Sequence, residues 1–178
     1  MSAYLIVFVV AAVTTFALTP LVKRFATRIG AVDQPSERKL HAVATPTMGG
    51  LAMWLGFLVA MVASRSLPFF DVVNETAAEP LAAVVTCTLM VGLGAIDDRR
   101  GTSALAKLTA QIFIAGILVL LGVQLLYFVL PGEGLAILGA DEAVPLTILW
   151  VLACANAINL VDGLDGLAAG MVAIAAAT

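Results

Sequence analysis

Long apolar runs separated by short polar segments dominate this chain. The run at residues 4–22 is long enough for a helix to cross the hydrocarbon core of a bilayer, which takes about 20 residues. We expect further spans at residues 49–64, 80–96, 108–123 and 145–157, and another that begins at residue 167. The pattern therefore predicts an all-α fold, a polytopic transmembrane helical bundle with about five to six spans.

Two stretches do not fit a simple span. Residues 125–138 are apolar but contain Pro131, Gly132 and Gly134, so we expect an interfacial or re-entrant segment there. Residues 167–178 form an apolar run that stops without a charge or an interfacial aromatic residue. We therefore expect residues 1–178 to be a single membrane domain, the N-terminal part of a longer protein.

Composition supports a membrane location. The chain is 62% hydrophobic and only 12% charged, with a mean hydropathy of +1.08, whereas about 25% of residues are charged in soluble domains. Cys87 and Cys154 both lie in apolar runs, where a small buried hydrophobic role is expected and a disulfide or zinc site is not.

The basic residues predict the topology. Of the nine Lys and Arg residues, five lie in residues 23–48 and three in residues 97–107. Residues 67–79 and 124–145 contain none, and the exception, Arg65, stands at a span end where it can reach the interface. Because Lys and Arg are retained on the cytoplasmic side, we expect the polar loops there and the N-terminus outside.

Two adjacent carboxylates, Asp97 and Asp98, stand where the third span meets the cytoplasm. Such a pair repels itself unless cations offset its charge. Oxygen ligands of this kind suit Mg²⁺, which usually adds substrate phosphates to one or two carboxylates. The alternative is a solvated loop in which the two acids pair with Arg99 and Arg100, and the sequence leaves both interpretations open.

A second polar cluster recurs with a period of three, at Asn156, Asn159, Asp162 and Asp165. Steps of three drift by about 60° on an α-helix, so all four share a face only where the backbone departs from a helix. The neighbouring glycines allow that departure and a close approach to a ligand. The alternative, a helix end with a glycine stop, leaves two amides and two acids at the membrane edge unexplained.

The first polar loop contains Arg38, Lys39 and His41, followed by Thr47 at the start of the second span. We expect Thr47 to be the N-cap, and a helix N-terminus beside basic side chains is a natural phosphate site. Taken singly, each basic residue is also explained by retention on the cytoplasmic side, and the histidine by a surface position. Lys107 lies close enough along the chain to Asp97 to join a phosphate site or to balance charge.

The order of these motifs resembles the polyprenyl-phosphate N-acetylhexosamine-1-phosphate transferases. Within that family the first loop looks closer to the undecaprenyl- or decaprenyl-phosphate GlcNAc-1-phosphate transferases than to the phospho-MurNAc-pentapeptide transferases of peptidoglycan synthesis. The residues that carry the resemblance are Asp33, Pro35, Arg38, Lys39 and His41; Pro46, Thr47, Gly49 and Gly50; Gly94, Asp97 and Asp98; Lys107; and residues 156–166 from Asn156 to Gly166.

The resemblance implies an enzyme of the bacterial cytoplasmic (inner) membrane. It would transfer GlcNAc-1-phosphate from UDP-GlcNAc to a polyprenyl phosphate, giving UMP and polyprenyl-diphospho-GlcNAc in the first step of cell-envelope polysaccharide synthesis. Mg²⁺ is the implied cofactor, with Mn²⁺ as a second candidate. The expected catalytic residues are Asp97, Asp98, Asp162 and Asp165, the expected metal ligands are Asp97, Asp98 and Asp162, and the expected substrate-binding residues are Arg38, Lys39, His41, Thr47, Lys107, Asn156 and Asn159.

Two other functions stay open beside this one, the pentapeptide transferase and a secondary transporter. Transporters bind their ions near the bilayer midplane, whereas these carboxylates lie at span ends. The expected partners are the two substrates and the bilayer, with no nucleic acid, and a homodimer is one candidate oligomeric state. Because related transferases are longer, this chain alone is not expected to hold every catalytic group.

Overall fold

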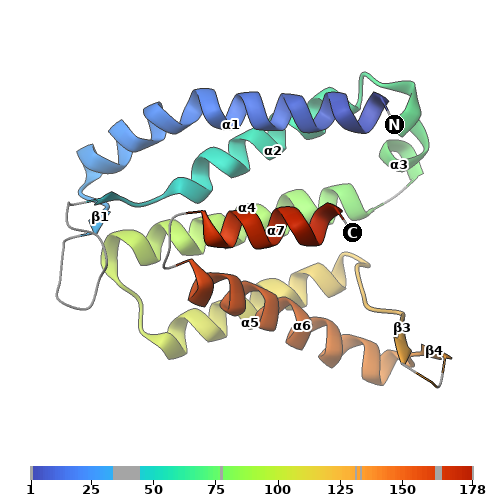
Figure 1. Ribbon diagram of the computed structural model, residues 1–178. Coiled ribbons are helices and arrows are strands. Elements are labelled where there is room, and N and C mark those ends of the chain that lie inside the picture. The colour runs from blue at the N-terminus through green and yellow to red at the C-terminus, as the bar shows by residue number, and fades with distance from the viewer. Residues whose placement is uncertain are drawn as a thin grey trace. The chain divides into compact units, whose positions relative to one another are not determined.

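The computed structural model describes residues 2–33, 45–76, 78–130, 132, 134–162 and 166–177 (Figure 1). The chain divides into two compact units. Of the described residues, those within 2–33 and 45–123 belong to unit 1, and those within 124–177 belong to unit 2. The prediction that residues 1–178 form one membrane domain stays a prediction.

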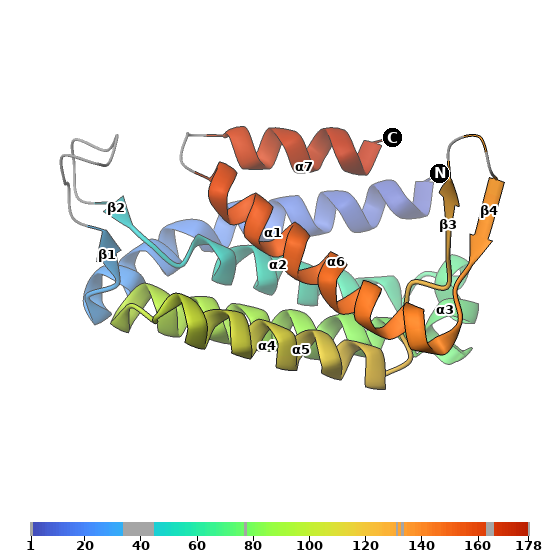
Figure 2. The same ribbon diagram turned by 90° about the horizontal axis from the view of Figure 1, so that it is seen from below.

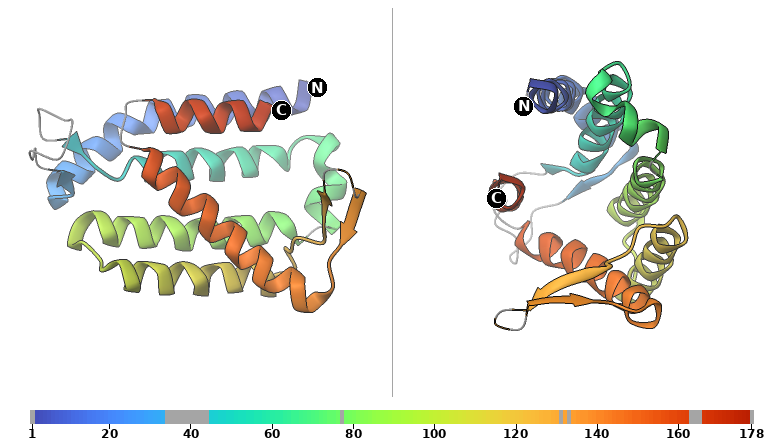
Figure 3. Two further views of the ribbon diagram at one scale, coloured as in Figure 1. Left: turned by 60° about the horizontal axis from the view of Figure 1, so that its bottom comes forward. Right: turned by 90° about the vertical axis from the view of Figure 1, so that its right-hand side faces the viewer.

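Unit 1 is built mainly from four long helices. α1 packs against α2, α2 against α4 and α4 against α5, so these helices form a row in chain order, seen nearly end-on in the right-hand view of Figure 3. The elements are α1 (Ser2–Ile29), β1 (Val32–Asp33), β2 (Thr45–Pro46), α2 (Gly49–Ser64), the 3-10 helix η1 (Pro68–Phe70), α3 (Asp71–Thr76), α4 (Glu79–Arg100) and α5 (Ala104–Leu120).

Small residues allow α1 and α2 to approach closely. The buried residues of α2 are Ala52, Gly56, Ala60 and Ser64, which recur every four positions on one face. A Cβ added at Gly56 would lie 2.1 Å from Oγ1 of Thr15 and 2.9 Å from a backbone carbonyl of α1. Small residues of this kind are typical of membrane helix interfaces, where close backbone packing replaces the hydrophobic effect as the stabilising force.

Unit 2 contains a β-hairpin followed by two helices, α6 (Ala140–Val161) and α7 (Leu167–Ala177). Strands β3 (Tyr127–Leu130) and β4 (Gly134–Ile137) pair antiparallel, with Tyr127 opposite Ile137, and the hairpin leads into α6 (Figure 2). The hairpin lies in the stretch expected to be an interfacial or re-entrant segment, and the rest of the described fold is mainly helical. Aromatic and β-branched residues on both sides of a glycine-containing turn favour a hairpin.

The predicted spans correspond to helices, but fewer of them are long enough to cross a bilayer. Within the described residues, α1, α4 and α6 pass by length and composition, and α2 makes a fourth if it is counted together with the segment Pro68–Asn74, bent from it by 95°. α5 has 17 residues and therefore rises about 26 Å, short of the roughly 30 Å hydrocarbon core. The protein is a multi-pass helical membrane protein with three to four spans by this criterion.

Candidate functional site

Asp97 lies in the last turn of α4, beyond the apolar stretch that ends at Ile96, and both of its carboxylate oxygens have partners. Oδ1 accepts hydrogen bonds from the backbone N–H of Thr102, at 2.9 Å, and from the Thr102 hydroxyl. Oδ2 accepts from Nζ of Lys107 at 2.8 Å, in an ion pair of which each side chain is 25% exposed. Lys107 and the two Thr102 hydrogen bonds lower the pKa of Asp97 to about 2, so this carboxylate stays charged.

Asp98, the next residue, is held differently. Its Oδ2 accepts a hydrogen bond from the backbone N–H of Met48 at 2.8 Å, which ties the end of α4 to the start of α2. Partial desolvation raises the pKa of Asp98, the charge of Asp97 raises it further, and the Met48 N–H opposes both effects. In the described part of the chain neither aspartate forms an ion pair with Arg99 or Arg100. The alternative in which the two acids pair with these arginines is therefore not found among the described residues, and the cation that offsets Asp97 is Lys107.

Thr47 does not cap α2 as the sequence predicted. The N-cap is Met48, with a left-handed backbone (φ 71°) and no side-chain cap. The backbone N–H of Thr47 and its hydroxyl each lie 3.0 Å from the carbonyl oxygen of Ala31. Thr47 thus links the start of α2 to the buried residue Ala31, which follows α1. Its hydroxyl is also close enough to Asp98 to lower the pKa of that residue.

The start of α2 remains open to approach. Of the free amides expected there, the Met48 N–H already binds Asp98. A Cβ added at Gly49 or Gly50 would meet no atom within 4 Å. The predicted anion site at this helix N-terminus is therefore partly occupied by a carboxylate of the protein, while two glycines beside it leave space for a ligand.

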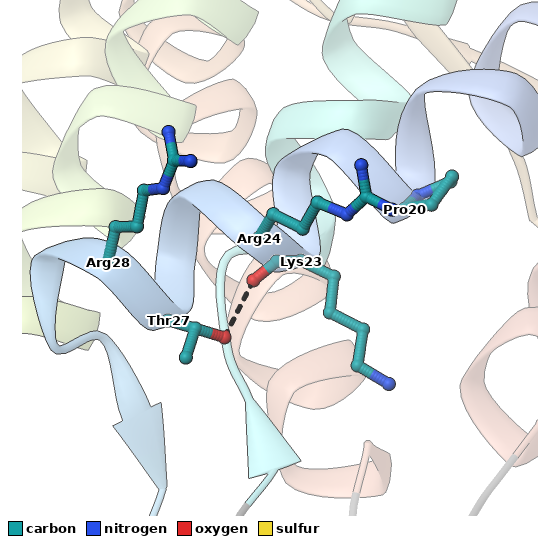
Figure 4. Close-up of a pocket in the computed structure, with 5 residues that line it drawn as sticks. All are labelled: Pro20, Lys23, Arg24, Thr27 and Arg28. Carbon is teal, nitrogen blue, oxygen red and sulfur yellow. Dashed lines mark hydrogen bonds between the residues drawn. The ribbon is translucent and has the colours of Figure 1, made fainter.

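The cytoplasmic end predicted for α1 has a basic surface that sequence reasoning used only for topology. A shallow pocket of about 620 Å³ is lined by Pro20, Lys23, Arg24, Thr27 and Arg28 (Figure 4). Arg24 and Arg28 point to one side of the helix and Lys23 to another, while the Thr27 hydroxyl donates to the Lys23 carbonyl at 2.9 Å. Lys23 also borders a pocket of about 170 Å³ together with Thr45 and Gly49, so a cation lies near the start of α2.

In unit 2 the predicted residues lie at the end of α6. The Nδ2 of Asn156 donates to the carbonyl of Leu152 at 2.8 Å, and Asn159 is exposed. Asp162 is the C-cap, and its N–H donates to the Ile158 carbonyl at 3.0 Å. The structure thus gathers Thr47, Asp97, Asp98 and Lys107 in unit 1, and Asn156, Asn159 and Asp162 in unit 2. Arg38, Lys39, His41 and Asp165 lie outside the described residues.

Comparison with known protein families shows which family the chain belongs to. The model of glycosyl transferase family 4 matches residues 80–178, which begin in α4 and include every predicted site residue from Asp97 onward. The chain belongs to glycosyl transferase family 4.

Individual family relatives match over most of this chain. It is 39% identical over 173 residues to the "probable undecaprenyl-phosphate N-acetylglucosaminyl 1-phosphate transferase" of Bacillus subtilis (strain 168), covering 97% of this chain and 46% of that protein. It is 42% identical over 168 residues to the "decaprenyl-phosphate N-acetylglucosaminephosphotransferase" of Mycobacterium leprae (strain TN), covering 93% and 42%. A "phospho-N-acetylmuramoyl-pentapeptide-transferase" of Desulforudis audaxviator is 34% identical over 192 residues, covering 94% and 56%.

The chain thus spans about half the length of the curated relatives it matches. No solved structure matches it significantly. The relatives support the assignment of the chain to this family.

Of the two adjacent aspartates, Asp98 has the carboxylate that is better placed to bind a magnesium ion. Both oxygens of Asp97 already accept hydrogen bonds, and one of them pairs with Lys107. Among the described residues, Asp98 accepts a hydrogen bond from the Met48 N–H through Oδ2 and lies near the Thr47 hydroxyl, but it forms no ion pair. Among the described residues, no group of three or more Asp, Glu, His or Cys residues gathers as a metal site. Asp98 is therefore the carboxylate best placed to bind a cation together with substrate oxygens.

Sequence reasoning missed Thr102, which makes two of the three hydrogen bonds to Asp97. Gly101 ends α4 with φ 63° and so turns the chain back toward the last helical turn. An Asp-x-x-x-Gly-Thr sequence at a helix end was the available signal, because a glycine there permits the left-handed turn that returns the next N–H to the helix.

Proposed function

We propose that the whole protein transfers N-acetylglucosamine 1-phosphate from UDP-N-acetylglucosamine to a polyprenyl phosphate at the cytoplasmic face of the bacterial inner membrane. The observation that carries this proposal is the pair Asp97 and Asp98 at one helix end, one neutralised by Lys107 and the other available. The relatives named as polyprenyl-phosphate N-acetylglucosamine-1-phosphate transferases support the choice of substrates.

The reaction requires positioning more than covalent chemistry from the protein. An oxygen of the lipid phosphate attacks the phosphorus bonded to the sugar, the bond from that phosphorus to the bridging oxygen breaks, and UMP leaves. Asp98 would orient the lipid phosphate or hold its proton. Asn156, Asn159, Asp162 and Asp165 would hold the nucleotide diphosphate, and Arg38, Lys39, His41 and Lys107 would offset phosphate charge. A covalent phospho-aspartate route is a second form of the same chemistry.

Mg²⁺, or Mn²⁺ in its place, would supply positive charge to the diphosphate when bound. Asp98 would be its main protein ligand, and Asp97 and Asp162 are the further candidate ligands. Since Asp97 already forms an ion pair with Lys107, we expect Asp97 to hold the site together more than to bind the metal ion. The donors are oxygens, as this ion prefers.

The placement of the carboxylates favours a transferase over a transporter. Asp97 and Asp98 lie in the last turn of the helix that ends at Arg100, not at its middle. A soluble nucleotide sugar and a membrane lipid can meet only at such an interface, whereas transporters place ion-binding groups near the midplane.

The experiment is an assay of the full-length protein in membranes with polyprenyl phosphate and either of two donors. We expect transfer from UDP-N-acetylglucosamine that depends on added Mg²⁺ and produces UMP. Transfer from UDP-MurNAc-pentapeptide alone would move the protein to the other branch, in line with relatives at 30–34% identity. Absence of transfer from both donors, with an intact and folded protein, would reject the proposal.

A further inference from the structure

A pocket of about 350 Å³ lies in unit 1 at the opposite end of α2 from Asp98. Arg65 and Asn74 supply its polar lining, and Leu58, Val62, Leu81 and Val84 are among its apolar walls. α2 has 16 residues and therefore rises about 24 Å between the two ends. The pocket is thus close to one hydrocarbon thickness away from the carboxylate pair, and the proposed transfer reaction does not use it.

Arg65 is the one basic residue outside the two basic segments of the chain. It is the C-cap of α2 and is exposed. Among the described side chains, no carboxylate oxygen lies within 4.0 Å of its guanidinium. Asp71 and Glu79 are exposed nearby in the chain but do not line the pocket. The guanidinium, with five N–H donors, therefore has capacity for an anion.

Asn74 supplies an independent observation. Its Nδ2 is buried and has no hydrogen-bond partner in the part of the chain that the structure describes. A buried donor without an acceptor costs roughly 1–3 kcal/mol, so such groups in native proteins usually have a partner. The unpartnered Nδ2 of Asn74 is a donor and the Arg65 guanidinium is a cation with only donors, so an acceptor with negative charge would suit both.

The apolar walls restrict the class of anion. Side chains from α2 and α4 line the pocket beside the two donors, so a small hydrated ion would leave most of the lining in contact with water. A phosphate group joined to a hydrocarbon chain would accept from the two donors and also cover the apolar walls of the pocket. An arginine at the end of a span reaches the membrane interface, where it can contact the phosphate of a lipid headgroup.

We propose that this pocket binds an anionic phospholipid from the leaflet opposite Asp98, with its phosphate between Arg65 and Asn74 and an acyl chain along α2 and α4. The proposal is independent of the transferase activity, because it rests on the pocket alone. It commits to a membrane lipid as the occupant, and a free phosphate ion or a segment of the protein itself are outcomes of the test.

The test uses the full-length protein, stripped of lipid in detergent and then given dioleoyl-phosphatidylglycerol. Native mass spectrometry should show a tightly retained lipid, and its affinity should fall on the order of tenfold in Arg65→Gln and in Asn74→Leu, because each change removes a hydrogen bond to a charged group. Arg28→Gln, which removes an exposed arginine from the other end of unit 1, is the matched control and should retain the lipid.

Thermal unfolding provides the second readout, which does not depend on the variants binding anything. Without lipid, Asn74→Leu should unfold at or above the temperature of the wild type, because it removes an unpartnered donor. Added phosphatidylglycerol should then stabilise the wild type more than either pocket variant. Equal lipid shifts in all four proteins would overturn the proposal, and so would equal protection by inorganic phosphate. A pocket covered by the rest of the protein would retain no lipid and would also overturn it.

Discussion

The backbone N–H of Met48 donates a 2.8 Å hydrogen bond to Oδ2 of Asp98, although fifty residues separate them in the chain. Met48 is the left-handed N-cap of α2, and Asp98 lies in the last turn of α4. This contact sets the carboxylate of Asp98 at a helix N-terminus, where backbone amides favour negative charge. The neighbouring Asp97 instead binds Thr102, which follows α4, and Lys107, which lies in α5. Adjacent residues therefore have different roles.

The first prediction separates these roles. Asp98→Asn in the full-length protein should lower turnover by about 10²-fold or more, because it removes charge from the proposed phosphate centre, while thermal stability changes little. Asp97→Asn should also lower stability, by about 1 kcal/mol, since it leaves Lys107 without its partner. Turnover and thermal unfolding are measured at matched expression. Asp71→Asn, at an exposed position of α3, is the control, and near-normal turnover in both Asp97→Asn and Asp98→Asn would refute the proposed site.

The second prediction concerns the titration of Asp97. Its pKa of about 2 lies below the ordinary value of 3.8, so its contribution to stability is complete above pH 4 and is lost as the pH falls toward 2. Lys107→Met removes the largest cause of the shift. In that variant the pKa of Asp97 should rise toward 3.8, and less stability should be lost between pH 4 and pH 2.

Carboxyl titration by NMR checks the pKa directly, and unfolding midpoints across this pH range check the linked stability. Arg99→Met removes an exposed cation that makes no ion pair with Asp97 among the described residues, so it is the matched control. An Asp97 pKa unchanged by Lys107→Met would contradict the assigned ion pair.

The length of the apolar runs predicted the long helices well, because such a run in a membrane leaves few alternatives to a helix. The predicted span at residues 49–64 coincides with α2. At polar boundaries the prediction was poorer: α1 continues through Lys23, Arg24 and Arg28 to Ile29. Charged residues beyond the hydrocarbon do not end a helix, and Gly30, with φ 76°, marks the stop.

The sequence named candidate site residues but not the contacts that the structure gives them. Asp97 and Asp98 look equivalent in the sequence, and their different partners arise from a tertiary contact to Met48 and a loop return at Thr102. The Thr47 cap prediction failed for the same reason, because the Ala31 carbonyl competes for its hydroxyl. Local propensity does not contain such contacts, since they form only when distant segments pack.

The third prediction is the membrane topology, motivated by the uneven distribution of basic residues. The native thiols Cys87 and Cys154 are free, so both are first replaced by serine. A cysteine at the exposed position Arg100 should react with an impermeant maleimide only from the cytoplasmic side, and one at the exposed position Pro68 only from outside. Reaction of both from the same side would contradict the arrangement.

The last prediction tests the close packing of α1 against α2. Gly56→Leu should destabilise the protein by more than the roughly 1–3 kcal/mol typical of an overfilled core, because even a Cβ would lie 2.1 Å from Oγ1 of Thr15 and 2.9 Å from the Ala11 carbonyl. Gly56→Ala should be milder, since the Thr15 side chain can rotate while the backbone carbonyl cannot, and alanine favours the helix by about 1 kcal/mol. Gly116→Ala in α5 is the matched control, because a Cβ there would meet no atom within 4 Å. Thermal unfolding in detergent should rank Gly56→Leu lowest and Gly116→Ala at or above the wild type, and equal stability of the two Gly56 variants with the wild type would show that α1 and α2 do not pack this closely.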